Sequence, residues 1–148
     1  MTTSSARSRA GLHRTIPALP VRDVPAAVAH YGERFGFAAL HADAAFAVLG
    51  RDDAIVHLWG ATDDAWPERE DLRRRPVRSG AESFLAGTAS CRIEVEQVDD
   101  LFAELRAAGV LHPVSRDGVE GTDFGTREFA TLDLDGNLLA FFRREGSD

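Results

Sequence analysis

Side chains that commonly bind metals or act as catalytic bases are few in this chain of 148 residues. Five histidines and one cysteine are present, and no two histidines recur at the HxH or HxxxH spacing that places two ligands on one metal. His13, His30, His41 and His112 are isolated, and isolated histidines are usually ordinary surface or core residues. We expect no catalytic role for these four.

Nucleophilic chemistry also lacks a recognisable arrangement. Cys91 lies in the alternating strand pattern of 89–95, without a helix N-terminus to activate it, and is expected to be a small core residue. Ser79 and Ser83 do not stand in the strand–turn–helix context of a nucleophile elbow. No helix pattern follows the glycines of 118–125, which therefore indicate a hairpin loop rather than a phosphate-binding loop.

The charge of the chain restricts its partners. The net charge is −7, and the arginines at positions 7, 9 and 14 contribute +3, which leaves −10 on the remaining residues. Because a phosphate backbone needs a positive surface, this balance argues against DNA or RNA. Cationic or neutral partners are favoured.

Composition and cysteine usage indicate a cytoplasmic globular protein. The chain is 44% apolar and 28% charged, which is ordinary for a domain that folds without disulfides or a structural metal. A single cysteine suits a reducing compartment, and residues 1–11 lack the apolar stretch of a secretory signal. The apolar run at 138–142 is far too short to cross a bilayer, so no membrane partner is expected.

Periodicity and turn residues predict the same order of elements in both halves of the chain. Pro17 and Pro20 interrupt the first strand and place it at a sheet edge or an interface. Asp23 caps a helix that Gly36 ends. The predicted strands are 15–21, 38–41, 46–50, 55–59, 89–95, 110–114 and a closing hairpin with a turn at 133–137, and the predicted helices are 24–35 and 98–108.

The two halves are related by an internal repeat. Val24, Val28 and Tyr31 match residues 74 positions later, and the strand around His57 matches the strand around Ala140 at an offset of 83. A repeat of this size usually means pseudo-two-fold packing, because each unit alone has a sheet whose inner face must be covered. Residues 61–87 join the halves as a lid or a linker, with a short helix expected near 70–75.

These features resemble the vicinal oxygen chelate superfamily of glyoxalases, bleomycin resistance proteins and dioxygenases, and within it the bleomycin resistance proteins most. The motifs that carry the resemblance are Ile-Pro-Ala-Leu-Pro-Val-Arg-Asp-Val at 16–24, Arg-Phe-Gly-Phe at 34–37, Gly-Thr-Arg-Glu-Phe at 125–129 and Asp-Leu-Asp-Gly-Asn at 133–137. The likeness covers about 16–142.

The resemblance implies an α+β fold in which two βαβββ modules, in a pseudo-two-fold arrangement, form a half-open mixed β-sheet cup. The expected organisation is a flexible tail at 1–14 and a single domain at 15–148. Within that domain, module one covers about 15–60, the connecting insertion covers 61–87 and module two covers 88–143.

The superfamily's enzymes hold a metal at equivalent strand positions of the two modules. Those positions fall here on Ile16, His57, Ser90 and Ala140, and the internal repeat pairs them in the same way. Isoleucine and alanine have no donor atom and serine is a poor ligand for borderline metals, so no metal or other cofactor is expected. His57 is expected instead to face the cup as a hydrogen-bonding or titrating group.

Aromatic side chains are the remaining candidates for a binding site. In the bleomycin resistance proteins, rings on opposite sides of a groove at the dimer interface grip the flat tail of the drug, and the matching positions here are Phe46 and Phe124. The family commonly has tryptophan at the second position, so Phe124 is a departure that keeps stacking and loses a polar group. Residues that could extend the lining are Trp59, Trp66 and Phe84.

The sequence therefore predicts a metal-free homodimer that sequesters a flat, aromatic, cationic antibiotic and so confers resistance. Pro17 matches the family's proline at the bend of a first strand that reaches the partner subunit. One alternative is a metal-dependent lyase, isomerase or dioxygenase that uses His57 with ligands elsewhere in the chain. Another is a ligand-sensing or structural dimer with no role in resistance.

Overall fold

The described part of the chain forms two similar modules, built from two four-stranded mixed sheets and two α-helices. The computed structural model describes residues 9–61, 74, 80–81 and 85–146. The first module comprises β1 (Ala18–Val21), α1 (Val24–Phe35), β2 (Ala38–Ala42), β3 (Phe46–Arg51) and β4 (Ala54–Gly60). The second comprises β5 (Ser90–Glu94), α2 (Val98–Ala107), the 3₁₀ helix η3 (Pro113–Ser115), β6 (Glu120–Gly121), β7 (Thr126–Leu132) and β8 (Leu138–Arg144).

The strand order confirms the α+β fold and the repeat. The first sheet has the strand order β1-β4-β3-β2, and the second has the order β5-β8-β7-β6. β1 pairs in parallel with β4, and β5 pairs in parallel with β8. Ala18 pairs with His57 in the first sheet, and Arg92 pairs with Ala140 in the second. Arg92 follows Ala18 by 74 positions and Ala140 follows His57 by 83, which are the two offsets that the sequence predicts. The expectation that the proline-containing strand lies at a sheet edge is also confirmed.

Helix α1 begins and ends where its sequence predicts. The Asp23 side chain accepts a hydrogen bond of 3.0 Å from the Ala26 amide, and Pro25 lies in the first turn, where a missing N–H costs nothing. Gly36 ends the helix in the left-handed region, with φ of 72°. Helix α2 has no side-chain cap at Gln97, but Asp99 and Asp100 place negative charge at its positive end.

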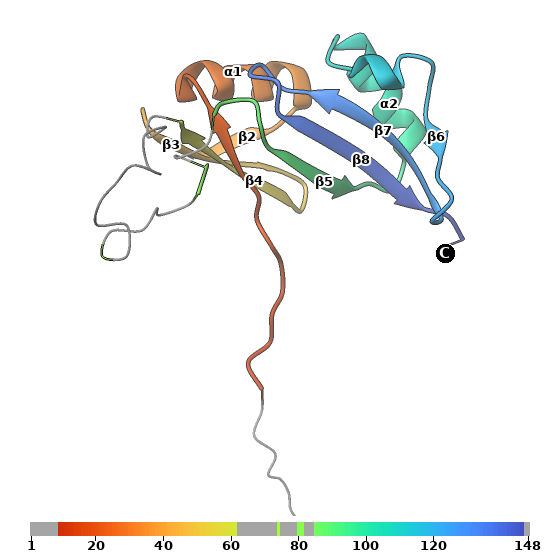
Figure 1. The fold of residues 1–148 in the computed structure, drawn as a ribbon, viewed down its shortest axis with the longest axis horizontal. Coiled ribbons are helices and arrows are strands. Elements are labelled where there is room, and N and C mark those ends of the chain that lie inside the picture. Colours follow the sequence, from red (N-terminus) through yellow and green to blue (C-terminus); the bar gives the residue numbers. More distant parts are fainter. Residues whose placement is uncertain (1–8, 62–73, 75–79, 82–84, 147–148) are drawn as a thin grey trace, which may run out of the picture.

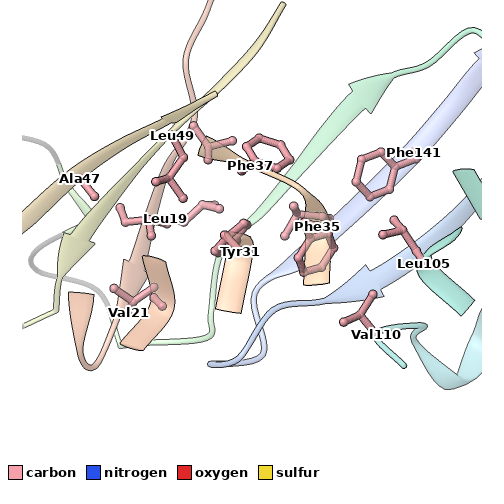
Figure 2. Close-up of a cluster of buried hydrophobic side chains, with 14 of the residues drawn as sticks. Leu19, Val21, Tyr31, Phe35, Phe37, Ala47, Leu49, Leu105, Val110 and Phe141 are labelled. Carbon is pink, nitrogen blue, oxygen red and sulfur yellow. The ribbon is translucent and has the colours of Figure 1, made fainter. Parts of the chain in front are cut away.

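One hydrophobic core runs through both modules. Leu19, Leu49 and Tyr31 belong to the first module, Leu105 and Phe141 belong to the second, and Phe35 and Phe37 lie toward the seam between them (Figure 2). The guanidinium of Arg34 donates a 2.6 Å hydrogen bond to the carbonyl of Ala108, which lies 74 positions later. Because the two residues are equivalent in the repeat, this contact places the pseudo-two-fold axis near the C-terminal ends of α1 and α2.

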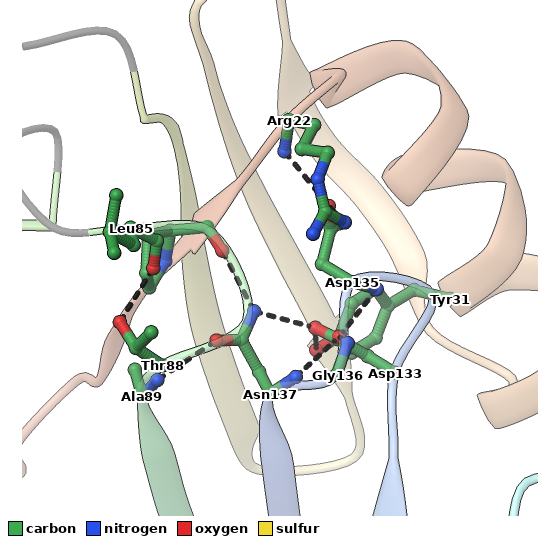
Figure 3. Close-up of polar contacts among 10 residues, drawn as sticks. Arg22, Tyr31, Leu85, Thr88, Ala89, Asp133, Asp135, Gly136 and Asn137 are labelled. Carbon is green, nitrogen blue, oxygen red and sulfur yellow. Dashed lines mark hydrogen bonds and ion pairs between the residues drawn. The ribbon is translucent and has the colours of Figure 1, made fainter. Parts of the chain in front are cut away.

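The turn between β7 and β8 joins the modules (Figure 3). The Asp133 carboxylate accepts bonds from the amides of 135, 136 and 137, and from the Tyr31 hydroxyl of α1 at 2.7 Å. The fully buried Asn137 amide group donates to the Pro20 carbonyl at 2.8 Å and accepts from the Ala89 amide at 3.1 Å. The turn thereby connects β1, α1 and the segment that leads into β5.

The structure differs from, refines or leaves undescribed three locally predicted elements. The strand predicted at 110–114 is wrong: Leu111 forms an isolated bridge to Thr131, and Pro113, which has no amide hydrogen to donate, starts η3. The predicted hairpin loop contains the two-residue strand β6, which is paired to β7. The helix expected near 70–75 lies almost entirely outside the described residues.

Candidate ligand-binding site

Among the described residues, each sheet has one face covered by a helix and one face that no helix covers. In Figure 1 both helices lie on the same side of the two sheets, and residues 9–17 extend from the start of β1 on the other side. Along β3 and β5 the core-facing residues alternate with less buried ones, as expected when only one face is packed. We call the side opposite the helices the open face.

The open face of the first module carries a cluster of rings. The Phe46 ring lies 4.6 Å from the Trp59 ring and 5.1 Å from the His57 ring, which meets it edge-on. The His41 ring lies 5.8 Å from Phe46 on the other side. These distances are those of favourable aromatic pairs. Adjacent strands place the three predicted residues together, because Phe46 is paired directly with Trp59 across β3 and β4.

His41 is fixed at the edge of this aromatic cluster. Its Nε2 lies 3.0 Å from a carboxylate oxygen of Asp43. The pKa of Asp43 is lowered first by the hydrogen bond from the Ala45 amide and then by the bond to His41. The imidazole of His41 therefore borders the rings in a defined orientation. From the sequence, His41 was expected to be an ordinary surface or core histidine.

The open face of the second module is charged instead. The Arg92 guanidinium on β5 forms two hydrogen bonds to the Glu128 carboxylate on β7, of 3.2 and 2.8 Å, and lies 4.6 Å above the centre of the Phe142 ring on β8. The Thr126 hydroxyl donates a further bond to Glu128. The pKa of Glu128 is lowered, mainly by its hydrogen bond to Arg92.

The sequence analysis did not single out Arg92, Glu128 or Phe142. A usable signal was present, since Arg92 and Glu128 interrupt apolar strands at positions that the repeat equates with Ala18 and Phe46. That two such charges meet depends on the strand order, which brings β5 and β7 to either side of β8.

Phe124 lies apart from the aromatic cluster in a single chain. It belongs to the connection between β6 and β7, and it is 67% exposed. Figure 1 shows β3 and this connection at opposite ends of the molecule. Phe46 and Phe124 could therefore grip one ligand only if Phe124 came from another copy of the chain. Trp66 and Phe84, the other two residues of the predicted lining, lie outside the described residues.

The strand positions of the superfamily's metal ligands do not fit a metal here. Ile16 precedes β1, His57 is among the rings, Ser90 starts β5 and Ala140 lies beneath the side chain of Arg92. Only the imidazole of His57 is a good donor among the four. Within the described part of the chain, no three histidine, cysteine or acidic side chains are grouped closely enough to hold a metal ion.

Two further histidines, His112 and His30, and the cysteine have structural surroundings. The Nδ1 of His112 accepts a hydrogen bond from the Val114 amide and caps η3. His30 packs its ring near Tyr31 and Phe35, and burial lowers its pKa. Cys91 faces the core, where burial raises the pKa of its thiol to about 11. At neutral pH this thiol is protonated and a poor nucleophile, consistent with its expected role as a core residue.

A separate hollow lies on the helix side of the seam between the modules. Its volume is about 450 Å³, and its walls combine the Phe35, Phe37 and Phe141 rings with acidic side chains around Arg51 and Glu104. None of the predicted ligand-binding residues that the structure describes lines it. The open face and this hollow are therefore distinct features.

The chain belongs to the Glyoxalase/Bleomycin resistance protein/Dioxygenase superfamily, whose family model matches residues 11–141. Within that family it is 42% identical over 131 residues to bleomycin resistance proteins of Geobacillus stearothermophilus and Staphylococcus aureus, a match that covers 88% of this chain and 96% of each relative.

Solved structures give the same placement. The bleomycin-binding protein of the bleomycin producer Streptomyces verticillus, solved with copper(II)-bleomycin, superimposes with a TM-score of 0.66 at 26% identity. That match covers 94% of this chain and all of the other. No helix in the described part of the chain is long and apolar enough to span a membrane.

Proposed function

We propose that this protein binds bleomycin or a closely related antibiotic without a metal of its own and confers resistance by sequestering the drug. The observation that carries the proposal is the Phe46, His57 and Trp59 cluster on the open face of a chain 42% identical to bleomycin resistance proteins. Rings that are not buried in the core are available to stack on a flat ligand.

Sequestration requires affinity and no chemical step. The open face offers aromatic faces, a histidine, and an arginine held by a carboxylate, which can bind and orient a ligand. The net charge of −7 favours the approach of a cationic drug. Because three of the four superfamily metal positions lack a good donor, the proposal does not involve a metal bound by the protein itself.

The proposal includes a homodimer with two grooves, each formed by module one of one copy and module two of the other. The open faces have no covering element within the described chain, and residues 9–17, which we call the N-terminal arm, extend away on that side (Figure 1). Leu12 of this arm is 98% exposed and Ile16 is also exposed. A second copy would cover these apolar residues and bring its Phe124 toward Phe46. Pro17 directs the arm out of β1.

Drug binding is tested directly with Trp59 as the reporter. A Trp66→Phe variant leaves Trp59 as the only tryptophan, and its fluorescence should change on addition of bleomycin, metal-free or loaded with copper(II). Expression of the wild type should also raise the bleomycin concentration that a sensitive bacterium survives. Absence of both binding and protection would refute the proposed function.

The dimer is tested by removing the arm. Deletion of residues 1–17 leaves β1 intact and should convert the dimer to a monomer in sedimentation equilibrium, with bleomycin affinity lost. Deletion of residues 1–8 alone is the matched control and should leave the dimer unchanged. A stable dimer after the longer deletion would show that the arm does not carry the interface.

The expected cytoplasmic location belongs to the same proposal. It rests on the single cysteine, whose neutral thiol faces the core. A fusion to a fluorescent protein that matures in the cytoplasm would test it.

A further inference from the structure

The side chain of Arg92 crosses a whole strand. The order β5-β8-β7 places β8 between Arg92 and Glu128, and the residue paired with Arg92 on β8 is Ala140. Ala140 is in turn paired with Ala130 on β7. Two alanines in this row leave room for the guanidinium to lie across the sheet, and Ala140 is only 9% exposed although it faces the open side.

The position of the guanidinium is fixed by three groups. Two N–H groups are bonded to Glu128, the central carbon lies over the Phe142 ring, and the Thr126 hydroxyl donates a hydrogen bond to the Glu128 carboxylate. A planar, clamped arginine loses less freedom when it makes a further bond than a mobile one. The Arg92 side chain is 46% exposed and Glu128 is 22% exposed, so the pair is accessible from the open face.

Donors remain unused on this group. A guanidinium has five N–H donors, and the structure assigns two of those of Arg92 to protein acceptors in the described part of the chain. The cation is balanced by Glu128, so it does not repel the positive end of a drug at long range. At contact distance it still presents donors and no acceptor.

We propose that Arg92 is a specificity-determining residue that donates hydrogen bonds to acceptor oxygens of the bound drug, such as carboxamide or carboxylate oxygens. This inference rests on the proposed function. The first module of one copy then binds the flat aromatic part of the ligand, and the second module of the other copy binds its acceptor-rich part. The two walls of the groove therefore fix the direction in which the ligand lies.

The test compares Arg92→Met with the wild type in stopped-flow binding of bleomycin. The substitution keeps an unbranched stem over Ala140 and removes all donors. We expect dissociation to be about tenfold to a hundredfold faster, because bonds to a charged donor are the strong ones, while association changes little. Arg143→Met is the matched control: it removes the same charge from the neighbouring strand β8, on the opposite face, and should change neither rate.

Other outcomes separate this inference from the proposed function. If the wild type binds bleomycin and Arg92→Met, folded by circular dichroism, binds it equally, the role of Arg92 is refuted and the function stands. If only the association rate falls and high salt abolishes the difference, Arg92 acts as a general charge and the inference is also refuted. Should Arg92→Met fail to fold, Arg92→Lys serves: it keeps the charge, loses the planar fork and should still dissociate faster than the wild type.

Discussion

In the first module Phe46 packs against Trp59 across β3 and β4, whereas in the second Glu128 faces Phe142 across β7 and β8. The neighbouring pairs of residues, Ala18 with His57 and Arg92 with Ala140, also differ between the two sheets. Ala18 leaves room for His57 in the first sheet, and Ala140 leaves room for Arg92 in the second. At equivalent positions, one face carries rings and the other carries an ion pair.

The difference shows which constraints keep a repeat similar. Backbone pairing and core-facing residues such as Leu58 and Phe141 fix the register of both sheets, because a slip by one residue would turn the core residues outward. The open-face residues are free of that constraint. A scaffold used twice can thereby form a groove whose two walls have different chemistry.

The turns that precede the last strands also differ. The turn between β3 and β4 has two residues, Asp52 and Asp53, and both are exposed. The turn between β7 and β8 has five residues and contains the buried Asp133 and Asn137. The longer turn hydrogen-bonds to the other module, whereas Asp52 and Asp53 form no such bond within the described part of the chain, so the two turns have unequal effects on stability.

The largest expected effect is the loss of that longer turn. Asp133→Ala removes the acceptor from the Tyr31 hydroxyl and from three backbone amides. Because each buried donor left unsatisfied costs about 1–3 kcal/mol, we expect the free energy of unfolding to fall by roughly 3–5 kcal/mol. Asp53→Ala, in the short turn, is the control and should change it by less than about 0.5 kcal/mol. Urea denaturation measures both, and equal losses would contradict the contrast between the turns.

The next effect concerns the aromatic wall. Phe46→Ala and Phe124→Ala should each weaken bleomycin binding by about 2–4 kcal/mol, at least about thirtyfold, from lost stacking and ring burial. Phe124→Ala should leave the unfolding midpoint unchanged because the ring is exposed, whereas Phe46→Ala should lower it slightly because the ring contacts Trp59 and His57.

Val114→Ala is a suitable control for these two variants, since its side chain is exposed to a similar degree and lies on η3. It should bind bleomycin like the wild type. If Phe124→Ala is fully stable and binds bleomycin with unchanged affinity, Phe124 does not belong to the binding site. If the variant unfolds, the Phe124 ring belongs to the core.

A smaller effect should appear at alkaline pH. Burial, followed by the nearby Asp133 carboxylate, raises the pKa of Tyr31 well above its ordinary value of 10.0. The unfolded chain then loses this proton at a lower pH than the folded chain, so the stabilisation is complete below about pH 10 and is lost as pH rises toward the folded-state pKa. Cys91, with a pKa raised from 9.0 to about 11, adds a loss between those values.

Tyr31 is the only tyrosine, so tyrosinate absorbance reports this one residue. We expect the absorbance and the loss of circular dichroism to change together as pH is raised. Tyr31→Phe should remove part of the alkaline fall in stability while Cys91→Ala removes another part. Ionisation of Tyr31 in a protein that remains folded would contradict its bonding to Asp133.

The smallest effect concerns long-range attraction. With a net charge of −7, the association rate of a cationic drug should fall as salt is added, because charges beyond roughly 8 Å are screened at physiological ionic strength. Dissociation, which depends on the rings and on Arg92, should be nearly independent of salt. A salt-independent association rate would indicate a ligand without net positive charge.

Much of the fold could be predicted from the sequence. Asp23, Pro25 and Gly36 mark the ends of α1 by local chemistry, and the alternation around Cys91 and Ile93 marks β5. The prediction failed at 110–114, where apolar residues indicated a strand but Pro113 and the cap from His112 favour a 3₁₀ turn. At this position the apolar pattern favoured a strand, but Pro113 and the hydrogen bond to His112 stabilise the 3₁₀ turn.

The site was predictable in part. Phe46, His57 and Trp59 could be placed together because neighbouring strands and the alternation of side chains bring them to one face. The Arg92 and Glu128 pair could not, because the two residues are 36 positions apart and meet only across β8.

By itself the sequence determined most of the elements, the repeat, the family and the lack of metal ligands at Ile16, Ser90 and Ala140, since each of these depends on residue type or short spacing. The tertiary structure decided which residues meet. It placed the rings on one open face and the ion pair on the other, made the turn around Asp133 the connection between the modules, and separated Phe46 from Phe124 within one chain. Those outcomes follow from strand order and from the room that Ala18 and Ala140 leave for their neighbours, and no local pattern encodes either.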